Sequence, residues 1–383
     1  MNESEQEQIN IQRHSFRRRY IILTVFIVLL TIASLVFIYS TQEQKPDPAS
    51  EKIIRQAAAA QLNKDPNELT DEDFPEIREF YFYKYHLDGE PFIRLTDIKL
   101  LEKFTNLQKL ELSPVLTPEK EIPSWMKILA KLGIFNLEER LALDLRPLKK
   151  LSKLQELSLG GSPFYTIEPL KYLKNLNTLR LYGTPVKRSI KPLSDLTELR
   201  ELRLGNTRVS DLGPLKRLIN LQELWINGTS ISDLSPLKKL INLQVLWING
   251  TLISDLEPLR GLKNLQVLYA YDTQVSDIEP LQELINLRFL WLNETHVSSL
   301  EPINELSNLK ILALDHTQVY NLEPIKNLSN LTELRLAGTQ VSNLEPIKNL
   351  KNLGRLGIQD CTNITNEQIE DLQKALPNLK IVR

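Results

Sequence analysis

Apolar residues recur at a fixed period over most of the chain. The repeating unit begins with a leucine and is twenty-two residues long, apart from a single copy of twenty-three. The units start at Leu154, Leu176, Leu199, Leu221, Leu243, Leu265, Leu287, Leu309, Leu331 and Leu353. A unit this short cannot bury its own apolar face, so neighbouring copies must stack and share one core. The period therefore predicts a solenoid, with its regular part over residues 154–361.

Each unit divides into a strand and a turn. In the copy LQELWINGTSISDLSPLKKLIN, Leu224 and Ile226 alternate with Trp225, so the two aliphatic side chains share one face of a short strand. The second half cannot be a strand interior because proline has no ladder donor. Its aspartate and proline, Asp233 and Pro236 in this copy, instead predict a capped 3-10 turn. The same residue types recur at Asp211, Asp255 and Asp277, and at Pro214, Pro258 and Pro280.

The ninth position of every unit holds a small side chain with hydrogen-bonding capacity. Its occupants are Ser162, Thr184, Thr207, Thr229, Thr251, Thr273, Thr295, Thr317, Thr339 and Cys361. Stacked turns bury backbone groups that need partners, and a hydroxyl can both donate and accept. We interpret this column as an internal structural ladder, in which the single cysteine of the chain is a buried thiol and not a nucleophile.

A strict period of this length is typical of leucine-rich repeats. The unit resembles those of bacterial internalin-like proteins, which also carry an xIxDLxPLxxLxxL half, although threonine stands here where many internalins have asparagine. The resemblance covers roughly residues 50–383. It implies an α/β solenoid, a leucine-rich-repeat horseshoe with a parallel concave sheet and short 3-10 turns on the convex side. It also implies recognition of a macromolecule, without indicating which one.

The flanks of the repeats look like the caps of that family. The segment EKIIRQAAAAQLNKDPNELTDEDF follows Asp47 and Pro48, which predicts a helical N-terminal cap. This cap and a first irregular repeat take residues 51–106. Residues 362–383 are similar to a helix-strand C-terminal cap, in which Thr365 and Gln368 form a capping box.

An irregular repeat separates the N-terminal cap from the regular units. It occupies residues 107–153 and is too long by about one helix. The excess, within residues 113–146, predicts a helix from about Pro123 to Leu132. Its apolar face, which includes Trp125, either packs on the first repeats or docks a partner or a membrane surface.

An uncharged segment near the N-terminus predicts a membrane anchor. Residues 20–39 are apolar and long enough to span a bilayer. Arg17, Arg18 and Arg19 precede them, and the positive-inside rule keeps such a flank in the cytoplasm. We therefore expect a cytoplasmic tail (1–19), a transmembrane signal-anchor helix (20–39), a linker (40–50) and repeats exported to the periplasm or cell surface. A cleaved signal peptide is the alternative, disfavoured by the length of the run and by the lack of an A-x-A-like site.

Composition and motifs argue against several functional classes. A single cysteine excludes an intrachain disulfide, and exported eukaryotic solenoids usually have disulfide-bonded caps, so a bacterial envelope protein is favoured. The net charge of −1 argues against nucleic acid as the main partner. Neither the four histidines nor the other residues form a metal-binding spacing, a nucleophile elbow or a phosphate loop. We expect a protein without catalysis, metal or cofactor.

Aromatic residues occupy the outward fifth position of four consecutive units, where the repeat requires none. We call Trp225, Trp247, Tyr269 and Trp291 the aromatic stripe. The same column holds Arg180, Arg203 and Arg335 at its two ends, and the neighbouring columns add Phe289, Tyr271, Asn227, Asn249 and Asn293. Large exposed aromatic patches usually mark interaction sites, so we predict that these residues bind a ligand. Lateral stacking that merely stiffens the sheet is the alternative.

Two classes of ligand suit this surface. A protein or peptide would use the tryptophans and arginines as anchors. A cell-envelope glycan would stack its sugar rings on the aromatic faces and hydrogen-bond to the asparagines. A purely structural scaffold in the envelope is a third possibility. The resemblance favours a protein or peptide partner.

Overall fold

The computed structural model describes residues 47–81, 93–95, 97–112, 115–116, 142–186 and 189–383. The chain divides into two compact units, one made of Met1–Asp47 and Glu121–Leu137 and the other of Pro48–Lys120 and Glu138–Arg383. Only Asp47 of the first unit lies among the described residues. All the other described residues belong to the second unit.

A 13-stranded parallel sheet runs through this second unit, with its strands in sequence order. Most strands have three residues and pair in register with the next, so that Leu224 lies opposite Leu246 and Trp225 opposite Trp247. The strands are β1 (Glu79–Tyr81), β3 (Lys109–Glu111), β5 (Glu156–Ser158), β6 (Thr178–Arg180), β7 (Glu201–Arg203), β8 (Glu223–Trp225), β9 (Val245–Trp247), β10 (Val267–Tyr269), β11 (Phe289–Trp291), β12 (Ile311–Ala313), β13 (Glu333–Arg335), β14 (Arg355–Gly357) and β15 (Lys380–Val382). A separate parallel pair joins β2 (Ile93–Arg94) to β4 (Val115–Leu116).

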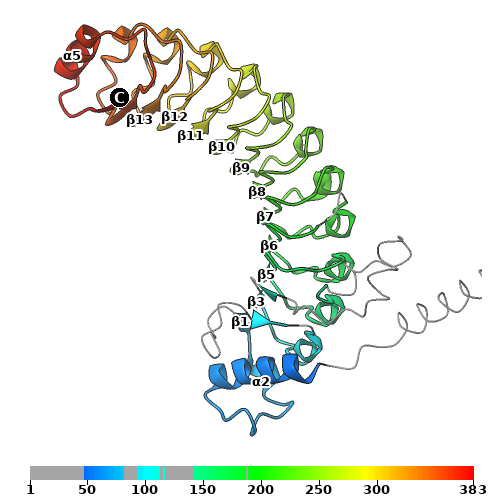
Figure 1. Cartoon of the computed structure of the whole chain (residues 1–383). Helices are drawn as coiled ribbons and strands as arrows, with labels where there is room; N and C mark the ends of the chain where they lie inside the picture. Colours follow the sequence, from blue (N-terminus) through cyan, green and yellow to red (C-terminus); the bar gives the residue numbers. More distant parts are fainter. Residues whose placement is uncertain (1–46, 82–92, 96, 113–114, 117–141, 187–188) are drawn as a thin grey trace, which may run out of the picture. The chain divides into compact units, whose positions relative to one another are not determined.

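Short 3-10 turns connect the strands on the side away from the sheet (Figure 1). They are η1 (Phe74–Glu76), η3 (Lys99–Lys103), η4 (Arg146–Lys150), η5 (Glu168–Tyr172), η6 (Lys191–Leu193), η7 (Gly213–Arg217), η8 (Ser235–Leu237), η9 (Glu257–Leu259), η10 (Glu279–Leu281), η11 (Glu301–Ile303), η12 (Glu323–Ile325) and η13 (Glu345–Ile347). Within this unit the sheet follows the inner side of the curve and the turns the outer side. The predicted leucine-rich-repeat solenoid is confirmed.

The aspartate before a turn does not occupy the N-cap position of the 3-10 helix. It lies one residue before that position. Leu234 occupies the N-cap of η8 and makes no side-chain capping bond. Asp233 instead accepts the N–H of Ser235 through Oδ1 at 2.7 Å, which closes a local Asx turn. Pro236 then fixes φ at the start of the helix. Each aspartate therefore does start a turn, as predicted, but from the position before the cap.

One apolar core extends along the whole solenoid. Leu224, Ile226, Leu246 and Ile248 are all fully buried, whereas Trp225 between them is half-buried. Parallel pairing in register places the same leucine of each unit against its equivalent in the next. The alternation read from the sequence thus has the predicted register, with the core on one side of each strand and the stripe on the other.

The threonine ladder is also confirmed by its contacts. Thr229 donates its hydroxyl to the carbonyl of Ile226 at 2.6 Å, and every other threonine in the column donates in the same way to the residue three positions earlier. Cys361 continues the column, with Sγ 2.9 Å from the carbonyl oxygen of Leu336. The hydroxyls therefore satisfy carbonyls at the point where the chain leaves the strand.

A second ladder, which was not predicted from the sequence, lies where the strands begin. Asn242 donates its amide Nδ2 to the carbonyl of Ile219 in the preceding unit at 2.9 Å. Seven other asparagines make the same contact, namely Asn175, Asn220, Asn264, Asn286, Asn308, Asn330 and Asn352. This ladder ties most units to their predecessors, whereas the threonines act within their own unit.

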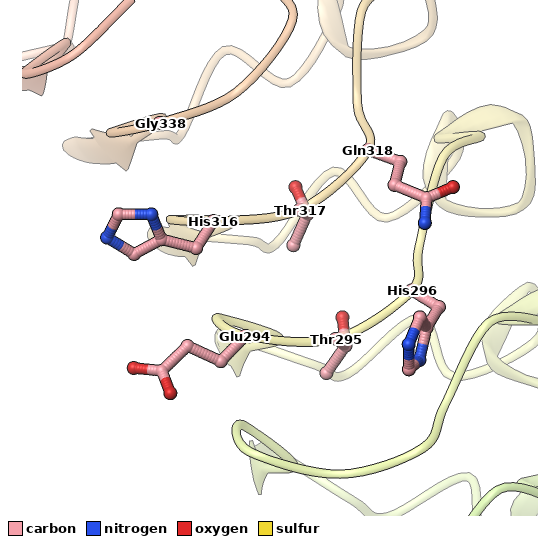
Figure 2. Close-up of a pocket in the computed structure, with 7 residues that line it drawn as sticks. All are labelled: Glu294, Thr295, His296, His316, Thr317, Gln318 and Gly338. Carbon is pink, nitrogen blue, oxygen red and sulfur yellow. The ribbon is translucent and has the colours of Figure 1, made fainter.

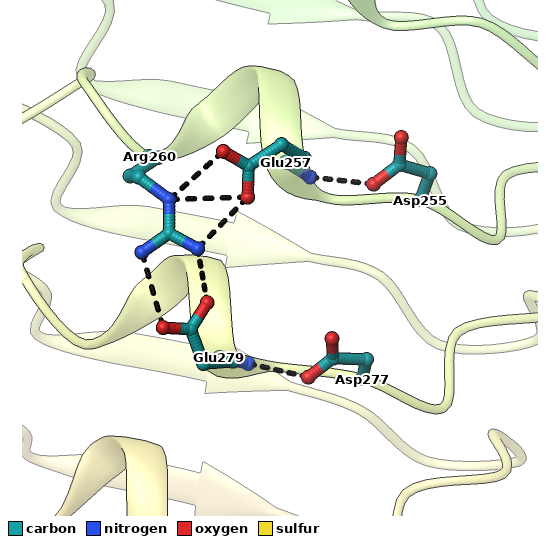
Figure 3. A network of polar contacts seen from close by, with 5 residues as sticks. All are labelled: Asp255, Glu257, Arg260, Asp277 and Glu279. Atoms are coloured by element: carbon teal, nitrogen blue, oxygen red, sulfur yellow. Dashed lines mark hydrogen bonds and ion pairs between the residues drawn. The ribbon is translucent and has the colours of Figure 1, made fainter.

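Charged side chains also join neighbouring turns on the outer side (Figure 3). Arg260 donates from Nε to Glu257 at 2.9 Å and from Nη1 to Glu279 of the next unit at 3.2 Å. Asp255 and Asp277 meanwhile accept the backbone N–H groups of the same two glutamates. These exposed contacts link two units without contributing to the core.

A helix lies next to each end of the described sheet, where the caps were predicted. Helix α2 (Pro48–Leu62) buries Ile54, Ala57 and Ala58, and it takes the last three residues of the predicted linker. Helix α5 (Asn366–Ala375) begins with the predicted capping box, in which Thr365 accepts the N–H of Gln368 at 3.3 Å. Strand β15 then closes the sheet beside β14.

Two predicted helices lie outside the described residues. They are the membrane anchor at residues 20–39 and the helix from Pro123 to Leu132. Among the residues that the structure does describe, none of the helices has the length and apolar character needed to cross a bilayer. Strand β3 pairs directly with β5, so the sheet continues across the irregular repeat.

Candidate ligand-binding surface

The aromatic stripe forms a continuous stack along the sheet. The ring centroids of Trp225 and Trp247 are 4.0 Å apart with the planes at 6°. Tyr269 follows at 4.1 Å from Trp247, tilted by 39°, and Trp291 at 3.9 Å from Tyr269 with the planes at 9°. These separations are shorter than the spacing of about 4.8 Å between strands, so the rings lean on each other.

The stack leaves ring edges, and few ring faces, for a ligand. Both faces of Trp247 and of Tyr269 are in contact with a neighbouring ring. All four rings are half-buried, and this burial raises the pKa of the Tyr269 phenol, with a further contribution from Tyr271. The exposed part is therefore a ridge of aromatic C–H edges with a phenol and indoles along it.

An arginine–glutamate cluster covers one end of the stack, and a second cluster lies two strands beyond the other end. Arg203 lies over Trp225, with Cζ 3.9 Å from the ring centroid, and it donates from Nε to Glu201 at 2.6 Å. Arg180 binds the same carboxylate from the other side, at 2.8 Å from Nε and 3.0 Å from Nη2. At the far end Arg335 donates to Glu333 at 2.7 Å. The three arginines predicted as ligand anchors are thus already engaged by carboxylates of the sheet.

These contacts alter the electrostatics of the Glu201 carboxylate. Burial alone would raise its pKa, but the hydrogen bonds and charges of Arg180 and Arg203 outweigh that effect and lower the pKa below its usual range. The same pairing raises the pKa of Arg180. Glu201 is therefore ionised at neutral pH and holds both guanidinium groups in place.

The columns beside the stripe differ in character. On one side the third position presents half-buried apolar side chains, which are Val245, Val267, Phe289 and Ile311. On the other side lie the predicted polar residues Asn227, Asn249, Tyr271 and Asn293. Because the strands pair in register, the predicted site residues of the four units that begin at Leu221, Leu243, Leu265 and Leu287 lie together. Arg180 and Arg335 stand at the outer limits of this surface.

Three buried polar atoms at this surface have no hydrogen-bond partner. Over the described part of the chain, the buried side-chain atoms in this condition are Trp225 Nε1, Asn249 Oδ1 and Asn293 Oδ1. All three belong to the stripe or to the column next to it. Buried polar groups are normally hydrogen-bonded, so these three atoms are polar groups for which the fold supplies no hydrogen-bond partner.

A pocket lies at the C-terminal ends of the strands, where the chain leaves the sheet (Figure 2). Glu294, His296, His316, Gln318 and Gly338 line it, together with two ladder threonines, and its volume is about 410 Å³. Glu294 and His316 have left-handed backbones, with φ of 55° and 56°. The eighth position takes this conformation in every regular unit, which explains its frequent glycines. This backbone requirement was not predicted from the sequence.

An acidic residue next to that region, Asp315, is already engaged by its neighbours. Asp315 accepts the Asn293 amide at 2.8 Å and the backbone N–H of Ala337 at 2.9 Å, so its carboxylate is used within the fold. In Figure 2 the imidazoles of His296 and His316 point away from each other. Among the described residues, no three histidine, cysteine or acidic side chains are placed to hold a metal ion.

Comparison with known proteins identifies the repeat. Three segments match the family model described as Leucine Rich repeats (2 copies), at residues 174–217, 219–261 and 263–305. They cover the stripe and most of the regular units. No curated protein matches the chain.

Solved structures with the same fold include bacterial and plant proteins. An internalin (inlF) from Listeria monocytogenes is 24% identical, with a TM-score of 0.71 over 89% of this chain and 98% of its own. The functional domain of InlJ from Listeria monocytogenes, which includes a cysteine ladder, is 16% identical, with a TM-score of 0.67 over 85% and 67%. The plant peptide hormone receptor RGFR1, in complex with RGF2, is 20% identical, with a TM-score of 0.55 over 71% and 50%. At these identities the similarity establishes the fold, a leucine-rich-repeat solenoid of internalin-like architecture.

Proposed function

We propose that the protein is a membrane-anchored, exported recognition protein without enzymatic activity, and that it binds a protein or peptide partner on the concave face of the sheet. The aromatic stripe is the observation that carries this proposal. Its four rings occupy positions that the repeat leaves free, and three unpartnered polar atoms lie among them or beside them. A ligand would cover the exposed ring edges of the stripe.

The stacking geometry favours a protein over a glycan at this surface. A sugar ring packs on the face of an aromatic ring, and the faces of Trp247 and Tyr269 are covered by their neighbours. A peptide or protein surface can instead pack apolar side chains against ring edges and against the apolar column of Val245 and Val267. Aromatic residues of this kind are enriched among the residues that dominate protein interfaces.

The fold gives general support to recognition. Leucine-rich-repeat solenoids present a rigid inner surface of stacked strands, so little ordering cost opposes the binding of a partner. RGFR1, which shares the fold, is a plant receptor in complex with a peptide hormone. Its identity to this chain is too low to transfer the ligand, so the chemistry of the partner rests on the stripe alone.

Membrane anchoring is supported by the sequence. Residues 20–39 carry no charge, and Arg17, Arg18 and Arg19 lie immediately before them. This arrangement retains the short N-terminal tail in the cytoplasm and places the repeats on the exported side. The anchor would then hold the binding surface close to the envelope, where a partner is captured.

Capture from envelope extract tests the proposal directly. The full chain in detergent is compared with Trp225→Ala/Trp247→Ala and with the matched control Lys238→Ala/Lys239→Ala, which changes two exposed residues of the outer side. We expect one protein to be retained by the wild type and the lysine variant and lost from the tryptophan variant. Retention that disappears after glycan-degrading treatment but survives protease would instead favour a glycan. Identical capture by all three chains would place the binding site outside the stripe, and capture of nothing by any of them would favour a structural scaffold.

A further inference from the structure

A groove runs along the edge of the sheet where strands β10 to β13 begin. Its volume is about 670 Å³, and it is separate from the aromatic stripe. Four asparagines of the ladder line it, Asn264, Asn286, Asn308 and Asn330. Gln266, Arg288 and Lys310, at the second position of consecutive units, complete it. The lining contains amides and two cations, and no carboxylate.

The asparagines present fixed hydrogen-bond acceptors to this groove. Each donates Nδ2 to a carbonyl of the preceding unit at 2.8 or 2.9 Å, and this bond holds the amide plane in place. The carbonyl oxygen Oδ1 of each amide is left to accept another donor. At the equivalent position in the irregular repeat, Asn106 Oδ1 accepts a hydrogen bond from the ammonium group of Lys153 at 2.7 Å.

The two cations are not explained by the fold. Gln222, Gln244 and Gln266 hold the same position in the three preceding units, so the repeat accepts a neutral amide there. Among the described residues neither Arg288 nor Lys310 has an ion-pair partner, although the Arg288 guanidinium lies 5.8 Å from the Phe289 ring centroid. Their backbones are joined by a hydrogen bond of 2.8 Å, so the two residues lie side by side on strands about 4.8 Å apart.

We propose that this edge groove binds an acidic saccharide. Its anionic groups, carboxylate or phosphate, pair with Arg288 and Lys310, and its hydroxyls donate to the Oδ1 atoms of the asparagines. A simple anion would leave the acceptors without donors, and a neutral sugar would leave the two cations unpaired. A ligand that carries both groups matches the whole lining. The guanidinium and ammonium groups suit either kind of anion.

The site lies beside the stripe but does not depend on it. The stripe occupies the fifth position of each unit and faces away from the core, whereas the groove uses the last and second positions at the strand starts. Saccharide binding at the edge and protein binding on the face can therefore be measured and abolished separately.

Calorimetry on the full chain in detergent tests the proposal with four probes. Oligogalacturonate carries carboxylates and hydroxyls, and a phosphorylated malto-oligosaccharide carries phosphates and hydroxyls. A neutral malto-oligosaccharide and tripolyphosphate each lack one of the two groups. We expect at least one of the first two to bind, and the last two to bind more weakly by about tenfold or more.

Variants then locate the site. Arg288→Gln/Lys310→Gln introduces the residue that the same column already holds elsewhere, so folding is preserved. This change should weaken binding by about tenfold or more, because two charge-assisted contacts are lost. The matched control Lys238→Gln/Lys239→Gln and the stripe variant Trp225→Ala/Trp247→Ala should bind the saccharide as the wild type does.

Three results would overturn the proposal. One is the failure of both acidic saccharides to bind the wild type. Another is equal binding of tripolyphosphate, since charge alone would then account for the interaction. The third is unchanged affinity in the Arg288→Gln/Lys310→Gln variant. Loss of saccharide binding in the stripe variant would also contradict the location, whereas loss of protein capture in that variant concerns the proposed function alone.

Discussion

Arg203 lies over the ring of Trp225, with its guanidinium carbon 3.9 Å from the ring centroid. The same guanidinium donates to Glu201 at 2.6 Å, so the carboxylate fixes the cation that covers the first ring of the stack. The Arg203–Glu201 ion pair at this end of the stripe is therefore part of the aromatic stack. An arginine held in this way covers one ring face and has less capacity to pair with an acidic ligand.

The pairing of Glu201 with Arg180 and Arg203 predicts a pH-dependent contribution to stability. The pKa of Glu201 is lower in the folded protein than its ordinary value of 4.5. Its stabilising effect is therefore fully present at neutral pH and is lost as the pH falls through the folded-state pKa. Urea midpoints from neutral to acidic pH should fall less steeply for Glu201→Gln than for the wild type. Parallel curves for the two chains would show that this carboxylate does not contribute.

Replacement of Thr251 by valine tests the threonine ladder. Valine keeps the shape of the side chain but removes the hydroxyl that donates to the Ile248 carbonyl at 2.5 Å. A buried carbonyl without its partner should lower the free energy of unfolding by about 1–3 kcal/mol. Chemical denaturation measures the loss, and Thr251→Ser, which retains the hydroxyl, serves as the control. A serine variant as unstable as the valine variant would point to the methyl group.

Trp247 gives a contrasting test of the sheet surface. An outward strand position suggests that its removal costs little, but both of its ring faces are stacked on neighbours. Each aromatic pair is worth about 0.5–1.5 kcal/mol beyond burial, so Trp247→Ala should destabilise the solenoid by about 1–3 kcal/mol. Denaturant midpoints check this value. A cost well below it would mean that the rings contribute little to the sheet.

The solenoid could be predicted almost completely from the sequence, because period and alternation are local signals. Leu224 and Ile226 alternate with Trp225, and this is enough to assign the core face and the outward face of each strand. The two ends could be predicted for a similar reason. The capping box of Thr365 and Gln368 depends on residues only three positions apart.

Contacts between neighbouring units were harder to predict from the sequence. The asparagine at the end of each unit is as regular as the threonine, but its partner is a carbonyl in the preceding unit, as for Asn242 and Ile219. The orientation of an outward ring is likewise set by the ring beside it. The period placed Trp225 and Trp247 in one column, but it could not show that their faces pair and that Glu201 engages the flanking arginines.

Membrane topology can be tested in cells with reporter fusions. One reporter is placed after Arg19 and a second after Arg383, using pairs of enzymes that are active on only one side of the membrane. The arginine cluster predicts that the first is cytoplasmic and the second exported. A C-terminal reporter active only in the cytoplasm would contradict the proposed orientation and export.

The last prediction separates a stack that stiffens the sheet from a stack that binds. Trp225→Phe/Trp247→Phe keeps one aromatic ring at each position, so most of the stacking with Tyr269 and Arg203 should survive. The change also removes Trp225 Nε1, a buried donor without a partner among the described residues. Losing such a group costs little, and we expect the free energy of unfolding to change by less than about 1 kcal/mol.

Ligand capture should respond differently to the same substitution. The phenylalanine rings present shorter edges than the indoles, so the aromatic area available to a partner decreases. We expect capture in envelope extract to fall by about tenfold or more, since aromatic anchors at an interface commonly contribute about 2 kcal/mol or more each. Lys238→Ala/Lys239→Ala should capture the partner normally. Native stability together with full capture in the phenylalanine variant would leave stiffening as the role of the stripe.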